Sequence, residues 1–258
     1  MNMDRREFLL KAFKFGGAMA CASLGFSMEE IAWAKCTGYY CGAASSGGGD
    51  SYLFRWNGDH ASGTSYAYTN SGGGSAQGSI GGAAVIDTTQ AHSGNAVQIY
   101  DEWDYIGWSS GVSGFVSTSE GSAEIWVYAD AEAISSGQVP LFETEYKVSD
   151  YLRARIVDGV VSFVHKGNNV KVALATTTTV PAQTYTRIRF RWSVTNNLIG
   201  VQIGANDWEN DSDADAVTAF ANAPTILRIG PGNLDYTVDY TAYIDDFEFI
   251  NGYNTFND

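Results

Sequence analysis

Charged residues are scarce in this sequence, and basic ones are scarcer still. They make up 17% of the 258 residues, and 15 Lys and Arg are outnumbered by 29 Asp and Glu, so the formal net charge is −14. Low charge combined with 14% aromatic residues excludes an intrinsically disordered chain, and no glycine period or coiled-coil composition is present. The shortage of Lys and Arg argues against nucleic-acid binding, because neutralising phosphates requires clustered cations. Tyr, Trp, Thr and Gly are abundant, which favours an all-β globular fold.

No hydrophobic run is long enough for a membrane-spanning helix, which needs about 20 residues. The apolar stretch at residues 15–26 is shorter and rich in Gly and Ala. It follows residues 4–11, which resemble the twin-arginine export motif, and it precedes an A-x-A cleavage pattern at 32–34. This order of charged, apolar and small-residue regions is typical of an export signal. We therefore predict that residues 1–34 are cleaved and that the mature protein begins at Lys35 in the periplasm or outside the cell.

The N-terminal region departs from the usual export motif at two positions. Asp4 stands where Ser or Thr is usual, and Leu10 stands where Lys is usual. Two alternatives stay open: an N-terminal amphipathic helix of the folded domain, and a lipid anchor on Cys21.

The sequence has only three Cys, and signal cleavage would remove the first of them. Cys36 and Cys41 remain, and an even pair in an exported protein predicts a short-loop disulfide. Two Cys make a poor zinc site here, because the nearest His is His60. We interpret residues 35–50 as a Cys-bearing segment ending in a Gly/Ser linker, with no cofactor required.

Beyond residue 50, short segments of alternating apolar and polar residues recur between Gly, Asn, Asp and Ser. This pattern predicts a β-sandwich or barrel, and the lack of an internal repeat predicts one domain. The clearest segments are 52–56, 96–100, 123–129, 151–157, 160–165, 170–175, 186–194, 199–203, 225–229 and 241–250.

Alternation gives two of these segments a basic face. Successive side chains point to opposite sides of a strand, so residues 187–192 place three apolar side chains on one side and three Arg on the other. Residues 152–156 place two Arg opposite their apolar side chains in the same way. We expect a solvent-exposed ligand face on one sheet surface, with aromatic residues on the same or an adjoining surface. Its members are Arg153, Arg155, Arg187, Arg189, Arg191, Trp126 and Tyr128.

Four passages, in order along the chain, resemble the LamG-like domains of the concanavalin A-like lectin/glucanase superfamily. They are residues 91–106, with the run Ala-His-Ser-Gly-Asn-Ala; residues 123–128, with Trp126 at the family's Trp position; Ile226-Leu227-Arg228-Ile229-Gly230; and Ala242-Tyr243-Ile244-Asp245-Asp246-Phe247. The resemblance implies a two-sheet antiparallel jelly-roll sandwich over residues 51–252, followed by a C-terminal tail at 253–258. It also implies carbohydrate recognition as the commonest activity, although fold alone does not fix function.

The resemblance further implies a structural Ca²⁺ held by Asp245. Alternation places Asp245 on the face of Phe247 and Phe249, pointing to the sandwich interior, where a buried carboxylate needs a partner. Asp59 is a candidate second ligand, and acceptance of backbone N–H bonds by Asp245 is the alternative. The acidic run at 207–215 lacks the Gly and Glu of an EF-hand, so we interpret it as a solvated loop.

Recognisable catalytic motifs of this superfamily are missing from the sequence. The Glu-x-Asp-x-x-Glu triplet of its glucanases does not occur, and Gln98-Ile99-Tyr100 has Tyr where its alginate lyases need His. Glu143 and Glu145 share one strand face. Their two carboxylates either act as a pair or lie on a solvated strand edge.

The sequence therefore favours an exported, non-catalytic carbohydrate-binding protein. Guanidinium groups match carboxylates bidentately, so the arginine face predicts an acidic polysaccharide as ligand. The alternatives are cross-strand pairing of these Arg with Glu124, Asp246 or Glu248, a polysaccharide lyase or hydrolase of the same fold, and a structural or adhesive cell-surface module.

Overall fold

The computed structural model describes residues 52–56, 64–69, 74–82, 84–87, 89–101, 103–109, 111–146, 148–211, 216–231 and 241–253. All of them belong to the second of two contact-defined units, Asp50–Asp258. The predicted export signal with Cys21, the segment carrying Cys36 and Cys41, and Asp59 lie outside the described residues.

The described residues form sixteen strands, one short α-helix and one turn of 3-10 helix. The helices are α3 (Ala131–Ser136) and η1 (Val112–Gly114). The strands are β1 (Tyr52–Trp56), β2 (Thr64–Thr69), β3 (Gly74–Gly81), β4 (Val85–Asp87), β5 (Ala96–Ile99), β6 (Tyr105–Trp108), β7 (Glu120–Ala129), β8 (Gln138–Tyr146), β9 (Asp150–Val157), β10 (Val160–Gly167), β11 (Val170–Thr179), β12 (Thr186–Ser193), β13 (Leu198–Ile203), β14 (Glu209–Asp211), β15 (Ile226–Ile229) and β16 (Ala242–Asn251). In this part of the chain no helix has the length and apolar character needed to span a membrane.

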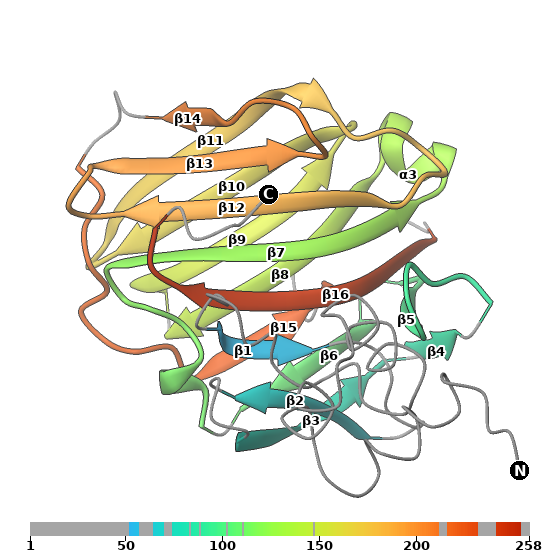
Figure 1. Ribbon diagram of the computed structural model, residues 1–258, viewed down its shortest axis with the longest axis horizontal. Helices are drawn as coiled ribbons and strands as arrows, with labels where there is room; N and C mark the ends of the chain where they lie inside the picture. The colour runs from blue at the N-terminus through green and yellow to red at the C-terminus, as the bar shows by residue number, and fades with distance from the viewer. Residues whose placement is uncertain are drawn as a thin grey trace, which may run out of the picture. The chain divides into compact units, whose positions relative to one another are not determined.

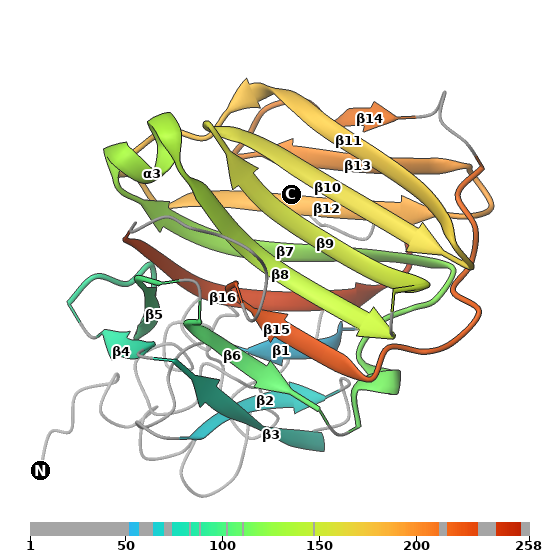
Figure 2. The same ribbon diagram turned by 180° about the vertical axis from the view of Figure 1, so that it is seen from behind.

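The strands make two packed layers, and every pairing between described strands is antiparallel. The first layer runs in the order β1-β16-β7-β12-β13-β14, and Figure 1 shows it facing the viewer. The second layer runs β11-β10-β9-β8-β15-β6 and faces the viewer in Figure 2. The predicted two-sheet jelly-roll sandwich is confirmed.

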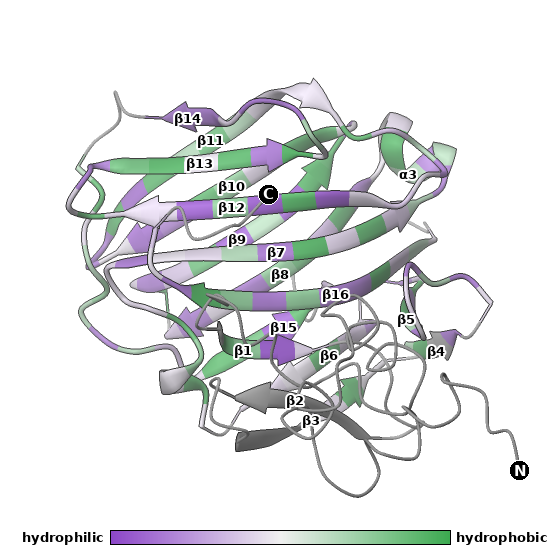
Figure 3. Cartoon of the chain, viewed as in Figure 1, coloured by the Kyte–Doolittle hydropathy of each residue, from purple (hydrophilic) through white to green (hydrophobic). Residues whose placement is uncertain are grey.

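Aromatic side chains fill the space between the layers. Phe142 of β8 packs edge-to-face on Phe190 of β12, with ring centroids 5.2 Å apart, and Phe163 of β10 lies 5.1 Å from the same ring. Phe247 of β16 also packs on Phe142, at 5.1 Å. Each large ring removed from water contributes about 1.5–3 kcal/mol. Hydropathy alternates along β7 and β12 in Figure 3, because only one side of each strand faces this core.

The ten predicted strand segments are confirmed, with ends that differ from the observed ones by at most four residues. Six strands were not predicted: β2, β3, β4, β6, β8 and β14.

Candidate functional site

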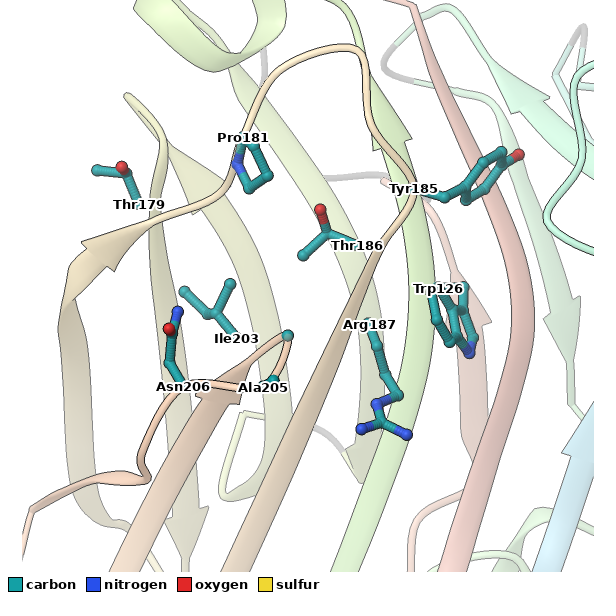
Figure 4. Close-up of a pocket in the computed structure, with 10 residues that line it drawn as sticks. Trp126, Thr179, Pro181, Tyr185, Thr186, Arg187, Ile203, Ala205 and Asn206 are labelled. Atoms are coloured by element: carbon teal, nitrogen blue, oxygen red, sulfur yellow. The ribbon is translucent and has the colours of Figure 1, made fainter. Parts of the chain in front are cut away.

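A pocket opens beside Trp126 and Arg187 at the end of the sandwich, where the connections that follow β11 and β13 meet (Figure 4). Arg187 on β12 is the direct partner of Trp126 on β7, so these two side chains share the outer face of the first layer. The cavity has a volume of about 510 Å³, within the range of about 300–1,000 Å³ typical of small-molecule sites. Its lining residues are Trp126, Thr179, Pro181, Tyr185, Thr186, Arg187, Ile203, Gly204, Ala205 and Asn206.

Two loops complete the walls, and backbone hydrogen bonds fix both. Gly204, at φ 61°, turns the chain after β13 and donates its N–H to the Arg187 carbonyl at 2.8 Å. The connection from β11 to β12 is held at Val180, whose N–H donates to Gly159, and at Gln183, whose N–H donates to Ala129, both at 2.8 Å. In Figure 4 Pro181 and Asn206 lie across the pocket from Trp126.

The indole of Trp126 contacts two planar groups. The His92 ring stacks on it with centroids 3.6 Å apart and an interplanar angle of 13°, and the Arg187 guanidinium carbon lies 6.0 Å from the ring centre. Stacked rings and cation–π contacts of this kind contribute about 0.5–1.5 kcal/mol each. Trp126 is therefore held in a defined orientation at the pocket wall.

Tyrosines extend this aromatic cluster. The Tyr185 hydroxyl donates to the carbonyl of Gln90 at 3.1 Å, and Tyr128 lies 5.5 Å from Tyr185 and 5.8 Å from Tyr243 between ring centroids. Burial, reinforced by the nearby Asp245 carboxylate, raises the pKa of Tyr185. The phenol therefore stays neutral at physiological pH.

Asp245 faces the outer side of the sheet, so the prediction that it points to the sandwich interior is wrong. It pairs with Trp126, whereas Glu248 pairs with Glu124, so β16 uses one more residue than β7 over this interval. This β-bulge contains Asp246 at φ 43°, and a bulge reverses the alternation that the sequence implies.

The Asp245 carboxylate anchors the loop that carries His92. One oxygen accepts the backbone N–H groups of His92 and Ser93 at 2.9 and 2.8 Å, and the other accepts the N–H of Asp246 at 2.8 Å. Burial and the adjacent Asp246 raise the pKa of Asp245 to about 6. The alternative role, acceptance of backbone N–H bonds, is thus observed.

Three possible metal ligands lie where the His92 loop meets the β16 bulge. Atoms of His92, Asp245 and Asp246 lie within 4.8 Å of one another, and His92 Nδ1 is 3.2 Å from the Asp246 carboxylate. Both Asp245 oxygens already accept N–H bonds, and Ca²⁺ prefers oxygen ligands over imidazole. These three residues alone are therefore a poor calcium cage, and the predicted second ligand, Asp59, lies outside the described residues.

The predicted single arginine surface is wrong, because its members lie on two different layers. Arg153 and Arg155 are on β9 in the second layer, whereas Arg187, Arg189 and Arg191 are on β12 in the first. Each set points away from its own layer's core, so the two sets face opposite sides of the sandwich. The structure brings only Arg187 together with Trp126 and the tyrosine cluster.

Two of the three β12 arginines are buried rather than exposed. Arg189 is 3% exposed; its Nε donates to Glu124 at 2.8 Å and its Nη1 to Gln202 at 3.3 Å. Arg191 is 9% exposed and donates to Asn210. Cross-strand pairing, the alternative that the sequence left open, therefore describes Arg189, with Glu124 as its partner.

On the second layer, Arg153 forms an ion pair with Glu143 across β8 and β9. Glu143 is 2% exposed and burial raises its pKa, although Arg153 opposes the shift. The interpretation of Glu143 as part of a solvated strand edge is therefore wrong. Arg155 donates to Gln138 at 3.2 Å on the same face.

Sequence reasoning missed Tyr185 and Asn206, which line the pocket from loops. Neither belongs to an alternating segment with an assigned face, so no periodicity indicated their direction. Both residues lie in connections next to predicted strand ends, and this position was the only indication in the sequence that they could line a site.

The chain matches no known protein-family model, and no curated protein shows a significant sequence match to it. Solved structures with a similar fold include the receptor-binding domain of the botulinum neurotoxin C/D mosaic serotype, with a TM-score of 0.59 and 13% identity over 80% of this chain and 49% of that one. The botulinum neurotoxin serotype D ligand-binding domain, solved in complex with N-acetylneuraminic acid, gives 0.57 and 13% over 80% and 48%. The type G receptor-binding domain gives 0.55 and 10% over 79% and 48%. The chain spans about half the length of these neighbours, and the likeness shows a β-sandwich fold.

Proposed function

We propose that this chain is an exported, non-catalytic carbohydrate-binding module of LamG-like type, and that it binds glycan in the pocket beside Trp126. One observation carries the proposal: an indole with a fixed orientation borders a cavity of about 510 Å³ that also presents a guanidinium, hydroxyl and amide groups. Sugars present C–H faces and hydroxyl edges, so their sites combine aromatic rings with a few polar groups.

The polar groups are suited to hydroxyl recognition. Thr179 offers a hydroxyl and Asn206 offers an amide, each able both to donate and to accept, whereas the Thr186 hydroxyl donates to the Thr184 carbonyl at 3.1 Å. The loop walls are fixed by backbone hydrogen bonds, which lowers the entropy lost on binding.

Arg187 supports an acidic sugar as the ligand. It is half-buried at the pocket wall, and a guanidinium matches a carboxylate in a bidentate pair. A domain of similar fold has been solved with N-acetylneuraminic acid, which is an acidic sugar. The acidic polysaccharide proposed here is therefore recognised through one carboxylate at Arg187, rather than through a broad cationic surface.

A glycan array followed by calorimetry tests this function. Trp126→Ala should weaken the binding of an array-positive acidic glycan at least tenfold, or about 1.4 kcal/mol. Trp103→Ala is the matched control, because Trp103 is 51% exposed and does not line the pocket. Release of shortened or unsaturated products would identify a hydrolase or lyase, and failure to bind any glycan would favour an adhesive module.

A further inference from the structure

A second aromatic cluster lies on the same outer face, at the other end of β12. The Arg191 guanidinium carbon is 4.1 Å from the centre of the Trp208 ring and 5.0 Å from that of Tyr253. Trp208 precedes β14, and Tyr253 follows β16, so three separate parts of the chain meet here. The pocket beside Trp126 does not include any of them.

Hydrogen bonds and a glycine fix the geometry of this cluster. The Asn210 side-chain oxygen accepts from Arg191 Nε at 3.2 Å and from Nη2 at 2.6 Å. A Cβ on Gly200 would lie 2.5 Å from that oxygen and 2.9 Å from Arg191 Nε, so the guanidinium can lie flat only over a glycine. Trp208 is half-buried, which leaves part of the ring accessible.

A row of planar polar groups connects the two aromatic clusters. Arg189 binds Glu124 and Gln202, and Gln202 Nε2 donates to the carbonyl of Asn206 in the pocket wall at 2.8 Å. Arg187 and Arg191 are four residues apart on one strand, which separates them by about 14 Å at 3.4 Å per residue. A single pyranose is too short to contact both clusters.

Charge differs between the two ends. The pocket end has Arg187, whereas at the other end the single positive charge of Arg191 is outnumbered by Asp207 and Glu209, which flank Trp208 in sequence. The Glu209 carboxylate accepts N–H and hydroxyl bonds from Thr177 and an N–H bond from Thr178. A negatively charged sugar is therefore favoured at Arg187 and disfavoured at Trp208.

We propose that Trp208 and Tyr253 form a second subsite, and that the ligand is a glycan chain lying along the outer face of β12. The chain carries an acidic sugar at Arg187 and a neutral sugar at Trp208. This inference rests on the proposed function, because it extends the same binding face.

Oligosaccharides of graded length test the second subsite. The probes are hyaluronan oligosaccharides of two, four and six sugars, which alternate acidic and neutral units, and oligogalacturonates of the same lengths, which are acidic throughout. Titration calorimetry of the full chain should show hyaluronan affinity rising about tenfold from two to six sugars, or about 1.4 kcal/mol. The rise for oligogalacturonates should be smaller.

Trp208→Ala and, separately, Tyr253→Ala should abolish this gain with length, so that long and short hyaluronan chains bind alike. Trp126→Ala should weaken every length, and Trp103→Ala should leave the wild-type pattern intact. Wild-type affinity that does not depend on length, or a full length gain in both subsite variants, would overturn the second subsite alone. If the wild type binds neither series and no glycan on an array, the proposed function fails and the second subsite fails with it.

Discussion

The imidazole of His92 lies nearly parallel to the indole of Trp126, with ring centroids 3.6 Å apart. Because the pocket borders the same indole, His92 acts as a positioning residue for it. His92→Ala should weaken glycan binding about tenfold while changing the unfolding free energy by less than about 1 kcal/mol, since the side chain is partly exposed. Affinity measured by calorimetry and stability measured by denaturant titration check the two expectations.

His92→Phe is the matched variant for this prediction. It keeps a flat ring against the indole and loses only the contact with Asp246, so it should retain most of the affinity. Tighter binding by His92→Ala would show instead that the imidazole blocks the indole face.

Arg189 is expected to be a structural residue. Its side chain is 4% exposed and that of its partner Glu124 is 17% exposed, and breaking such a buried pair costs about 3 kcal/mol. Arg189→Ala should therefore lower the urea midpoint strongly. Arg187→Ala, on the same strand but half-buried, should change stability by no more than about 1 kcal/mol and should weaken acidic-glycan binding. Equal stability losses in the two variants would contradict this division of roles.

Asp245→Asn should destabilise the loop that carries His92. The carboxylate accepts three backbone N–H groups, whereas an amide has one acceptor oxygen, so one buried N–H loses its partner at a cost of about 1–3 kcal/mol. Thermal melts of wild type and variant check the loss.

The calcium prediction uses the same pair of proteins. A Ca²⁺ that Asp245 held together with ligands beyond His92 and Asp246, and that only the folded state bound, would stabilise that state by about 2.7 kcal/mol at a hundred times its dissociation constant. It would raise the wild-type melting temperature above that in excess chelator, and the variant would lose this difference. Identical wild-type melts in Ca²⁺ and chelator would reduce the role of Asp245 to that of a backbone acceptor.

His165 should make the protein less stable in acid. The ring is fully buried against Phe220, and burial lowers its pKa from 6.5 to about 4, opposed by Asp150. The unfolded chain therefore binds more protons than the folded chain between pH 6.5 and pH 4, so the His165 contribution to stability falls as pH falls through this window.

The comparison with His165→Leu isolates this contribution. Asp245, with its raised pKa, acts in the opposite direction over an overlapping range, so the relevant quantity is the difference in unfolding free energy between the two proteins. That difference should shift in favour of the variant from pH 6.5 to pH 4. Parallel pH profiles would contradict the prediction.

The export-signal pattern of residues 1–34 predicts that the mature protein begins at Lys35. Replacing the pair Arg5 and Arg6 by Lys should retain the uncleaved chain in the cytoplasm, because the twin arginines address the export machinery. Edman sequencing of the protein recovered outside the cytoplasm checks the cleavage site, and a retained Met1 on exported protein would contradict cleavage.

The clearest strands that the sequence predicted alternate in hydropathy, because apolar side chains face the core. β9 also alternates strictly in burial, whereas on β12 the outward-facing Arg189 and Arg191 are buried as well. β8 contains Pro140 and is buried from Val139 to Thr144, so its pattern does not alternate. β3 is rich in Gly and Ser, which carry no hydrophobic period.

Composition and local period were sufficient to determine an all-β sandwich, the segments that form most of its strands, and the faces of Arg187 and Trp126. Only the tertiary structure decided which layer each strand joined, and so separated Arg153 from Arg187. It also decided the direction of Asp245, because a bulge residue has no signature in the alternation. The physical reason is that strand pairing, bulges and loop walls depend on contacts between residues distant in sequence, such as His92 with Trp126, whereas periodicity records only what each strand buries.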